Sequence, residues 1–233
     1  MSWNIEFDRE WLKNLLVRVG YKQRQGTREF VLDPIESATL GNTLLLSNSG
    51  KSRYREFEAT MRYTFRGNNE LNASYVRSKA IGDLNDFNSY YSNFENPIIR
   101  KNERSLLPFD APNRFVFWGT FGVKYGITVA PVLDIRNGFP LSVIDEDRNF
   151  VGPRNRAGRF PNFGSLDLQV LKSISAPAPF REKYRLRVGV KFFNLTNHFN
   201  PRDFQGNLAS DEFGGFYNGV GRKLGMKFVI EKK

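Results

Sequence analysis

Apolar and polar residues alternate with a period of two over long stretches of this chain. From Phe57 to Arg66 every second residue is apolar, and the residues between them are glutamate, threonine or arginine. The same spacing of apolar residues runs from Tyr184 to Phe192 and from Leu224 to Ile230. Because successive side chains of a β-strand point to opposite faces, this period predicts long strands with one apolar and one polar face.

The pattern predicts about nine antiparallel strands in an up-and-down order. Several of them reach the roughly nine to eleven residues that a membrane-spanning strand needs, whereas strands of soluble proteins have about five or six. A further hairpin is predicted between Thr27–Leu32 and Thr43–Ser47, inside the first long connection. The nine strands are expected near residues 2–8, 15–23, 53–66, 71–78, 114–123, 127–136, 164–174, 184–194 and 222–230.

Short and long connections alternate between the predicted strands. Outer-membrane barrels have short periplasmic turns and long extracellular loops, and loops of this length are uncommon in compact soluble domains. The fold class that we expect is therefore all-β, a portion of an up-and-down transmembrane β-barrel. The short connections lie near residues 9–14, 67–70, 124–126 and 175–183, and the long ones near residues 24–50, 79–113, 138–163 and 196–221.

The predicted strand count suggests an incomplete barrel. If the short turns lie in the periplasm, the last predicted strand ends in the periplasm and the first predicted strand begins outside the cell. A complete single-chain barrel of this kind has an even number of strands, whereas about nine are predicted here. We therefore expect an incomplete barrel. We also expect no signal peptide, because Met1–Glu6 has neither a basic segment nor an apolar one.

Composition narrows the class of protein further. The mean hydropathy of −0.48 excludes a bundle of membrane helices, but it is compatible with strands that alternate between lipid and lumen. The absence of cysteine excludes disulfides and cysteine-bound metals. The formal net charge of +11 fits a solvated basic surface, a nucleic-acid-binding face, or a polar lumen and loops that meet anionic lipopolysaccharide or solutes.

Motifs that suggest nucleotide binding or catalysis lack the context that they need. Gly50–Ser52 resembles the end of a phosphate-binding loop, but a strand is predicted after it where the motif requires a helix. Gly219, Gly221 and Gly225 echo a dinucleotide fingerprint, yet they precede the last strand and no βαβ unit follows. His198, the single histidine, is interpreted as part of a turn, and histidine-pair metal sites or triads cannot form within the chain.

The acidic clusters have an equally simple interpretation. Asp145–Asp147, and Asp83 with Asp86, could bind calcium, but solvated loop tips are the simpler explanation. We therefore expect no catalytic, cofactor-binding or metal-binding residues, and we do not expect an enzyme.

Aromatic residues concentrate in or beside the predicted strands, and two explanations compete. They would form a girdle at the membrane interface, or they would stack on bases or sugars beside basic residues. Stacking sites need aromatic and basic residues on one face, whereas the clearest strands place them on opposite faces, which favours the membrane. The aromatics concerned are Trp3, Tyr21, Phe65, Tyr75, Phe115, Phe117, Trp118, Tyr125, Tyr184 and Phe228.

Five segments resemble motifs of one protein family in the same order and at similar spacing. They are Arg53–Arg62, Leu71–Lys79, Phe109–Phe115, Asn137–Ser142 and Phe193–Pro201, the last of which reads FNLTNHFNP. Together they resemble the C-terminal barrel region of TonB-dependent outer-membrane receptors of the Oar-like, carboxypeptidase-regulatory-domain-containing group. The chain departs from that family at its end, where Glu231–Lys233 follows the usual terminal aromatic position.

The resemblance implies a location and a set of partners. Such receptors form barrels of about twenty-two strands around an N-terminal plug and import scarce ligands with energy passed by TonB. Residues 1–233 are then expected to be one part of such a barrel in the bacterial outer membrane, without the plug. The expected partners are outer-membrane lipid and lipopolysaccharide, the plug and upstream strands, the barrel-assembly machinery, and TonB through the plug alone. Nucleic acid is not expected.

Two other functions remain open at this point. One is a small self-contained outer-membrane barrel or porin. The other is a soluble all-β module that binds glycan or nucleic acid, for which aromatic and basic side chains would share one face of the sheet.

Overall fold

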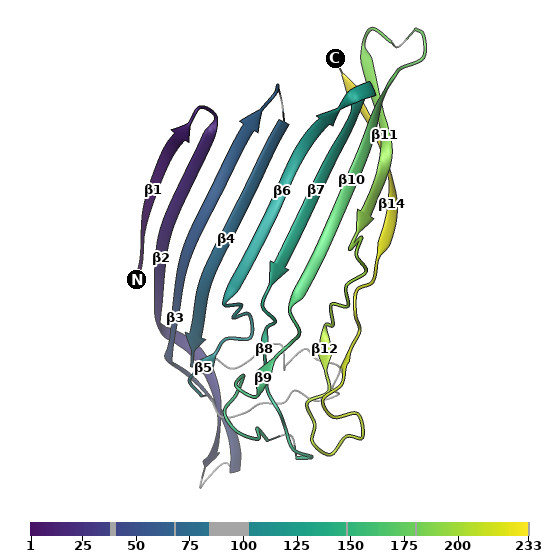
Figure 1. Cartoon of the computed structure of the whole chain (residues 1–233). Helices are drawn as coiled ribbons and strands as arrows, with labels where there is room; N and C mark the ends of the chain where they lie inside the picture. Colours follow the sequence, from purple (N-terminus) through teal and green to yellow (C-terminus); the bar gives the residue numbers. More distant parts are fainter. Residues whose placement is uncertain (38–40, 68, 84–102, 148, 180, 233) are drawn as a thin grey trace.

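The chain forms one broad antiparallel sheet (Figure 1). The structure is a computed structural model, and it describes residues 1–37, 41–67, 69–83, 103–147, 149–179 and 181–232. The sheet follows the order of the chain, and each long strand pairs antiparallel with the next. Its nine long strands are β1 (Ser2–Leu12), β2 (Leu15–Ser37), β3 (Gly41–Phe65), β4 (Asn69–Gly82), β6 (Asn113–Val123), β7 (Ile127–Arg136), β10 (Phe163–Ser175), β11 (Tyr184–Phe193) and β14 (Lys223–Lys232). The predicted all-β, up-and-down class is therefore confirmed.

The sheet is a single layer with two open edges. Among the described residues β1 pairs only with β2, and β14 pairs only with β11. The buried apolar side chains of that part of the chain are few and scattered, and include Val31, Leu107 and Leu171. An ordinary soluble sheet covers one face with a second layer, so this sheet has no conventional core.

Short and long connections lie at opposite ends of the strands, as predicted (Figure 1). The turn between β1 and β2 contains Asn14 with a φ of 72°, and the turn after β3 contains Gly67 with a φ of 81°. The turn between β6 and β7 is a single 3-10 turn, Lys124–Gly126. These three turns and the β10–β11 connection form the short-turn end; the other end is the long-loop end.

The predicted boundary of the first long connection was wrong. Residues 24–37 and 41–50 belong to strands and not to a loop, because β2 and β3 continue as one hairpin in which Val31 lies opposite Ser47. The hairpin predicted between Thr27–Leu32 and Thr43–Ser47 is confirmed in part: Val31 and Leu32 pair with Ser47 and Leu46, whereas Thr27 pairs with Lys51, and the hairpin continues the long strands. Register shifts between Thr27 and Val31 interrupt the two-residue alternation, which explains why the sequence pattern ended early.

The other long connections carry small strands of their own. β5 (Ser105–Leu106) extends the edge of β4. β8 (Pro140–Leu141) pairs with β9 (Gly158–Arg159), and β12 (Asp203–Phe204) pairs with β13 (Phe216–Tyr217). These three pairings give the long loops a defined shape over the described residues.

The strand register separates the sheet into an apolar and a polar face. Every second residue of each strand lies on one face, so the Cα partners extend the alternation across all nine strands. From Phe57 to Phe65 the apolar stretch of β3 rises roughly 26 Å at about 3.3 Å per residue, close to the apolar band of about 25 Å in outer-membrane barrels. We call the following residues the apolar belt: Ile5, Phe7, Leu15, Val17, Val19, Tyr21, Phe57, Ala59, Met61, Tyr63, Phe65, Leu71, Ala73, Tyr75, Phe115, Phe117, Phe121, Val123, Ile127, Val129, Pro131, Leu133, Ile135, Leu166, Leu168, Val170, Ile174, Leu186, Val188, Val190, Phe192, Leu224, Met226, Phe228 and Ile230.

Basic side chains on the belt face lie near its edges. Arg9 and Lys172 lie towards the short turns, and the ammonium of Lys172 donates to the carbonyl of Tyr125 in the neighbouring turn. Arg55 and Lys79 lie towards the long loops, directly opposite one another. Long basic side chains reach the polar boundary of a membrane from such positions.

Ion pairs concentrate on the polar face. Carboxylates and cationic side chains that face each other across neighbouring strands are neutralised locally, so the polar face carries internal partners for many of its charges. The pairs are Asp8–Arg18 at 2.6 Å, Lys22–Glu56 at 3.1 Å, Arg62–Glu70 at 2.7 Å, Arg114–Asp134 at 2.8 Å, and Arg187–Glu231.

Candidate ligand pocket at the long-loop end

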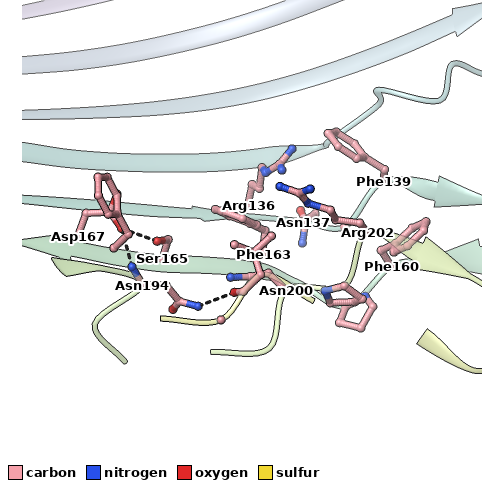
Figure 2. A pocket seen from close by; sticks show the side chains of 16 residues that line it. Arg136, Asn137, Phe139, Phe160, Phe163, Ser165, Asp167, Asn194, Asn200 and Arg202 are labelled. Atoms are coloured by element: carbon pink, nitrogen blue, oxygen red, sulfur yellow. Dashed lines mark hydrogen bonds between the residues drawn. The ribbon is translucent and has the colours of Figure 1, made fainter. Parts of the chain in front are cut away.

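A pocket of about 520 Å³ lies where β7, β10 and β11 leave the sheet for the long loops (Figure 2). Ser165 and Asp167 line it from the polar face of β10, and Phe193 lines it from the end of β11. The loops after β7 and β11 supply the remaining walls. The pocket therefore opens on the polar side of the sheet.

Arg136, the last residue of β7, lies between two aromatic rings. Its guanidinium carbon is 4.4 Å from the ring centre of Phe139 and 4.6 Å from that of Phe163. Both distances are within the range of cation–π attraction, which fixes the direction of the guanidinium. The side chain stays cationic, because arginine does not deprotonate in proteins.

A second guanidinium lines the same pocket. Arg202 follows the loop motif after β11 and is exposed to solvent. Neither Arg136 nor Arg202 forms an ion pair with a carboxylate among the described residues. Two cations without acidic partners give this pocket a positive field that favours anionic groups.

The one carboxylate in the pocket, that of Asp167, is occupied by neighbouring donors. It accepts a hydrogen bond of 2.7 Å from the hydroxyl of Ser165 and one of 2.9 Å from the backbone N–H of Asn194 (Figure 2). Asp167 therefore holds the start of the loop after β11 rather than neutralising the two guanidiniums.

Asparagines shape the loop that closes the pocket. The Asn194 side chain donates to the carbonyls of His198 and Val220 and accepts from the His198 N–H at 3.0 Å. Asn200 binds Gly164 of β10 in both directions, at 2.9 Å and 2.8 Å. Buried backbone groups need such partners where no strand supplies them, which explains the asparagine-rich Phe193–Pro201 segment.

A chain of amides fixes the start of the loop after β7. Asn113 donates to the side-chain oxygen of Asn137 at 2.7 Å, and Asn137 donates to that of Asn162 at 3.1 Å. Next to it, a Cβ on Gly138 would lie 1.8 Å from the carbonyl oxygen of Phe160, so only glycine fits. This contact explains the glycine of the Asn137–Ser142 motif.

A buried ion pair links the loop before β6 to the loop after β7. Asp110, 2% exposed, accepts from the N–H of Ala80 at 2.7 Å and from Arg159 at 2.5 Å. Arg159 also donates to the carbonyl of Gly138 at 3.1 Å. The aspartate of the Phe109–Phe115 motif therefore holds these two loops together.

The structure gives the other sequence candidates structural positions. Gly50–Ser52 lies inside β3, so its interpretation as a loop was wrong, although no helix follows it. Gly219 and Gly221 precede β14, which contains Gly225, as the loop-to-strand interpretation predicted. His198 lies in the loop after β11, and its Nε2 is 3.1 Å from the carbonyl of Asn162.

The acidic candidates are dispersed. Asp145 accepts from the N–H of Asn149 at 2.7 Å, and Asp83 pairs with Arg104 at 3.1 Å. Asp86 lies outside the described residues. Within the described part of the chain, no group of three or more histidine, cysteine or acidic side chains could hold a metal ion.

Sequence reasoning did not select the two pocket arginines. Arg136 stands at the end of a predicted strand and Arg202 in a predicted loop, and arginines are common in both places. The available signal was their proximity to the Asn137–Ser142 and Phe193–Pro201 motifs. The register also corrects the aromatic set, because Trp118 lies opposite Val132 on the polar face.

Comparison with known proteins supports the fold. The chain matches no family model and no curated protein. Among solved structures it resembles the outer membrane transporter YddB from Escherichia coli, with a TM-score of 0.70 and 14% identity. The match covers 100% of this chain and 32% of that one, so the chain spans about a third of the transporter. The sheet therefore has the fold of part of an outer-membrane transporter barrel.

The described residues contain no helix long and apolar enough to cross a membrane.

Proposed function

We propose that this chain forms part of the wall and outer loops of a TonB-dependent receptor barrel that imports ligands across the outer membrane. The observation that carries the proposal is the two-faced sheet, in which an apolar belt crosses every long strand while charges pair on the other face. A lipid bilayer on one side and a water-filled lumen on the other would satisfy both faces. The Oar-like group is proposed on the five motifs alone.

The open edges support a wider barrel. An unpaired strand edge in hydrocarbon costs several kcal/mol for each unsatisfied backbone group, so membrane sheets close on themselves. We propose that further strands pair with β1 and β14, and that a plug, the barrel-assembly machinery and TonB act with the whole receptor. The likeness to about a third of a larger transporter fits this arrangement.

The pocket has a natural place in such a receptor. With the long loops outside the cell, the pocket of Arg136 and Arg202 lies on the lumen side of the outer mouth. We propose that it contacts anionic groups of solutes entering the barrel, with Phe139 and Phe163 packing against their apolar parts. We assign the chain no catalytic role.

Single-cysteine labelling tests the proposal cleanly, because the chain has no cysteine of its own. Cysteine would be placed in turn at Val188, Val190 and Met226 of the belt and at Arg187, Lys191 and Lys227 of the polar face. In vesicles, a water-soluble maleimide should label the polar-face positions, and a lipid-borne quencher should reach probes on the belt positions. Equal labelling of both sets would contradict the proposal.

A further inference from the structure

Four basic residues form a cluster on the outer side of the sheet, just beyond the apolar belt. They are Arg53 and Arg55 of β3 and Arg77 and Lys79 of β4, which we call the outer basic cluster. All four are exposed and lie on the belt face at the long-loop end. The cluster therefore faces away from the lumen pocket.

The cluster has no internal counter-charge. None of its members forms a hydrogen bond or an ion pair with another side chain in the described part of the chain. Arg55 and Lys79 are direct Cα partners across the strands, an arrangement of like charges that disfavours the sheet. An external anion would remove this repulsion.

The surface at the cluster is hollowed and amphipathic. Arg53, Arg55 and Lys79, together with Ile81, line a hollow of about 170 Å³. Phe57 of the belt is the direct Cα partner of Arg77 and lies two residues from Arg55 on the same face of β3. An anionic group bound here would therefore lie directly above apolar side chains.

We infer that the outer basic cluster binds the phosphorylated headgroup of an anionic lipid in the outer leaflet. Guanidinium and ammonium groups would bind the phosphate oxygens, and the acyl chains would pack along Phe57 and the belt below. A soluble phosphate would leave the apolar surface unused, and a nucleic acid could stack on aromatic rings but would leave the aliphatic part of the belt uncovered. The continuity between cluster and belt therefore favours a lipid. The inference rests on the proposed orientation of the barrel.

A pair of double variants tests this inference. The protein in zwitterionic detergent micelles would be titrated with diphosphoryl lipid A, and bound lipid measured by native mass spectrometry. Arg55→Gln with Lys79→Gln should bind roughly thirtyfold more weakly, as expected from the attraction of each cation near an anionic lipid surface. The control, Arg24→Gln with Lys191→Gln, removes the same charge from the polar face and should keep the original affinity.

Each other outcome overturns the inference. Equal losses in both double variants would indicate a general effect of net charge, and tighter binding of inorganic phosphate or a single-stranded oligonucleotide would indicate another partner class. Circular dichroism tests whether each variant folds. If the variant with Arg55→Gln and Lys79→Gln does not fold, the single variant Arg77→Gln is titrated in its place. If the single-cysteine labelling separates the two faces as expected but the protein does not bind lipid A, this inference is wrong and the proposed function is still supported.

Discussion

The apolar belt and the long-loop end of this protein follow opposite rules of burial. In the belt, large apolar side chains are exposed: Met226 is 92% exposed, Ile5 66% and Phe228 61%. At the long-loop end, polar side chains are buried: Ser105 is fully buried, Asp110 is 2% exposed and Asn194 4%. A soluble domain buries its apolar side chains and its hydrogen-bonded polar groups together in one core. Here the large apolar side chains and the buried polar groups lie in two different regions.

The difference in burial arises because the apolar belt and the long-loop end have different surroundings. Belt side chains contact neighbours on their own face, as Phe65 contacts Tyr63 and Phe121, but no second layer of the described structure covers them. Much of their stabilisation therefore has to come from apolar material outside the protein. Buried polar groups at the long-loop end have partners inside it, as Asp110 has in Arg159 and Ala80. Stability in the belt should therefore depend on which face a residue occupies, and stability of the loops on individual hydrogen bonds.

The largest expected effect separates the two faces within one strand. Met226→Arg places a cation on the belt, which should cost about 2–4 kcal/mol near the middle of a bilayer. Gly225→Arg places the same side chain on the polar face, where a Cβ meets nothing within 4 Å, and should change stability little. Urea unfolding in vesicles measures both. Equal losses would show that the belt does not face lipid.

The choice of control position matters for that experiment. Gly189 also lies on the polar face, but a Cβ there would be 1.9 Å from the carbonyl oxygen of Val170. Any substitution at Gly189 would therefore displace β10, and its effect would not report on the face.

The next effect tests the loops. Asp110→Ala leaves the N–H of Ala80 and the guanidinium of Arg159 without their buried acceptor, which should cost about 1–3 kcal/mol. Asp147→Ala, at an exposed position, should have almost no effect. Chemical unfolding and the rate of proteolysis in residues 103–112 compare the two. A loss in Asp147→Ala as large as that in Asp110→Ala would contradict the importance of the buried pair.

A smaller effect should appear at the pocket. Arg136→Gln removes one of two cations and should weaken binding of benzoate, used as a simple aromatic anion, by roughly tenfold. Arg222→Gln, just outside the pocket lining, should bind as the original protein does. Saturation-transfer NMR in micelles measures both affinities. Unchanged binding in Arg136→Gln would remove this arginine from the proposed site.

The smallest effect concerns alkaline pH. Burial, with the hydrogen bond to Glu56 and its charge, raises the pKa of Tyr54 from 10.0 to about 12, and Tyr54 lies beyond the belt on β3. The unfolded chain then loses this proton at lower pH than the folded one, so stability should fall as pH rises from 10 to 12. Tyr54→Phe should flatten that fall. Denaturation midpoints across this range test it, and parallel curves for both proteins would exclude Tyr54 as the cause.

The strands and their two faces could be read from the sequence by itself. The alternation of apolar and polar residues is clear in β3, β11 and β14, and β7 (Ile127–Arg136) matches its predicted boundaries. Successive side chains of a strand point to opposite faces because of local backbone geometry. The face of each residue can therefore be predicted without knowing which strands pair with it. The prediction failed at residues 24–37 and 41–50, where register shifts between Thr27 and Val31 interrupt the alternation.

Only the tertiary structure decided how the long loops dock and where charges meet. Asp110 and Arg159 are far apart in the chain, as are Asn113 and Asn137, and nothing in their local sequence pairs them. The same holds for the pocket arginines and for Arg55 beside Lys79, which become neighbours through strand register. A period of two determines the face on which each side chain lies, whereas the contacts across strands and between loops depend on which segments pair.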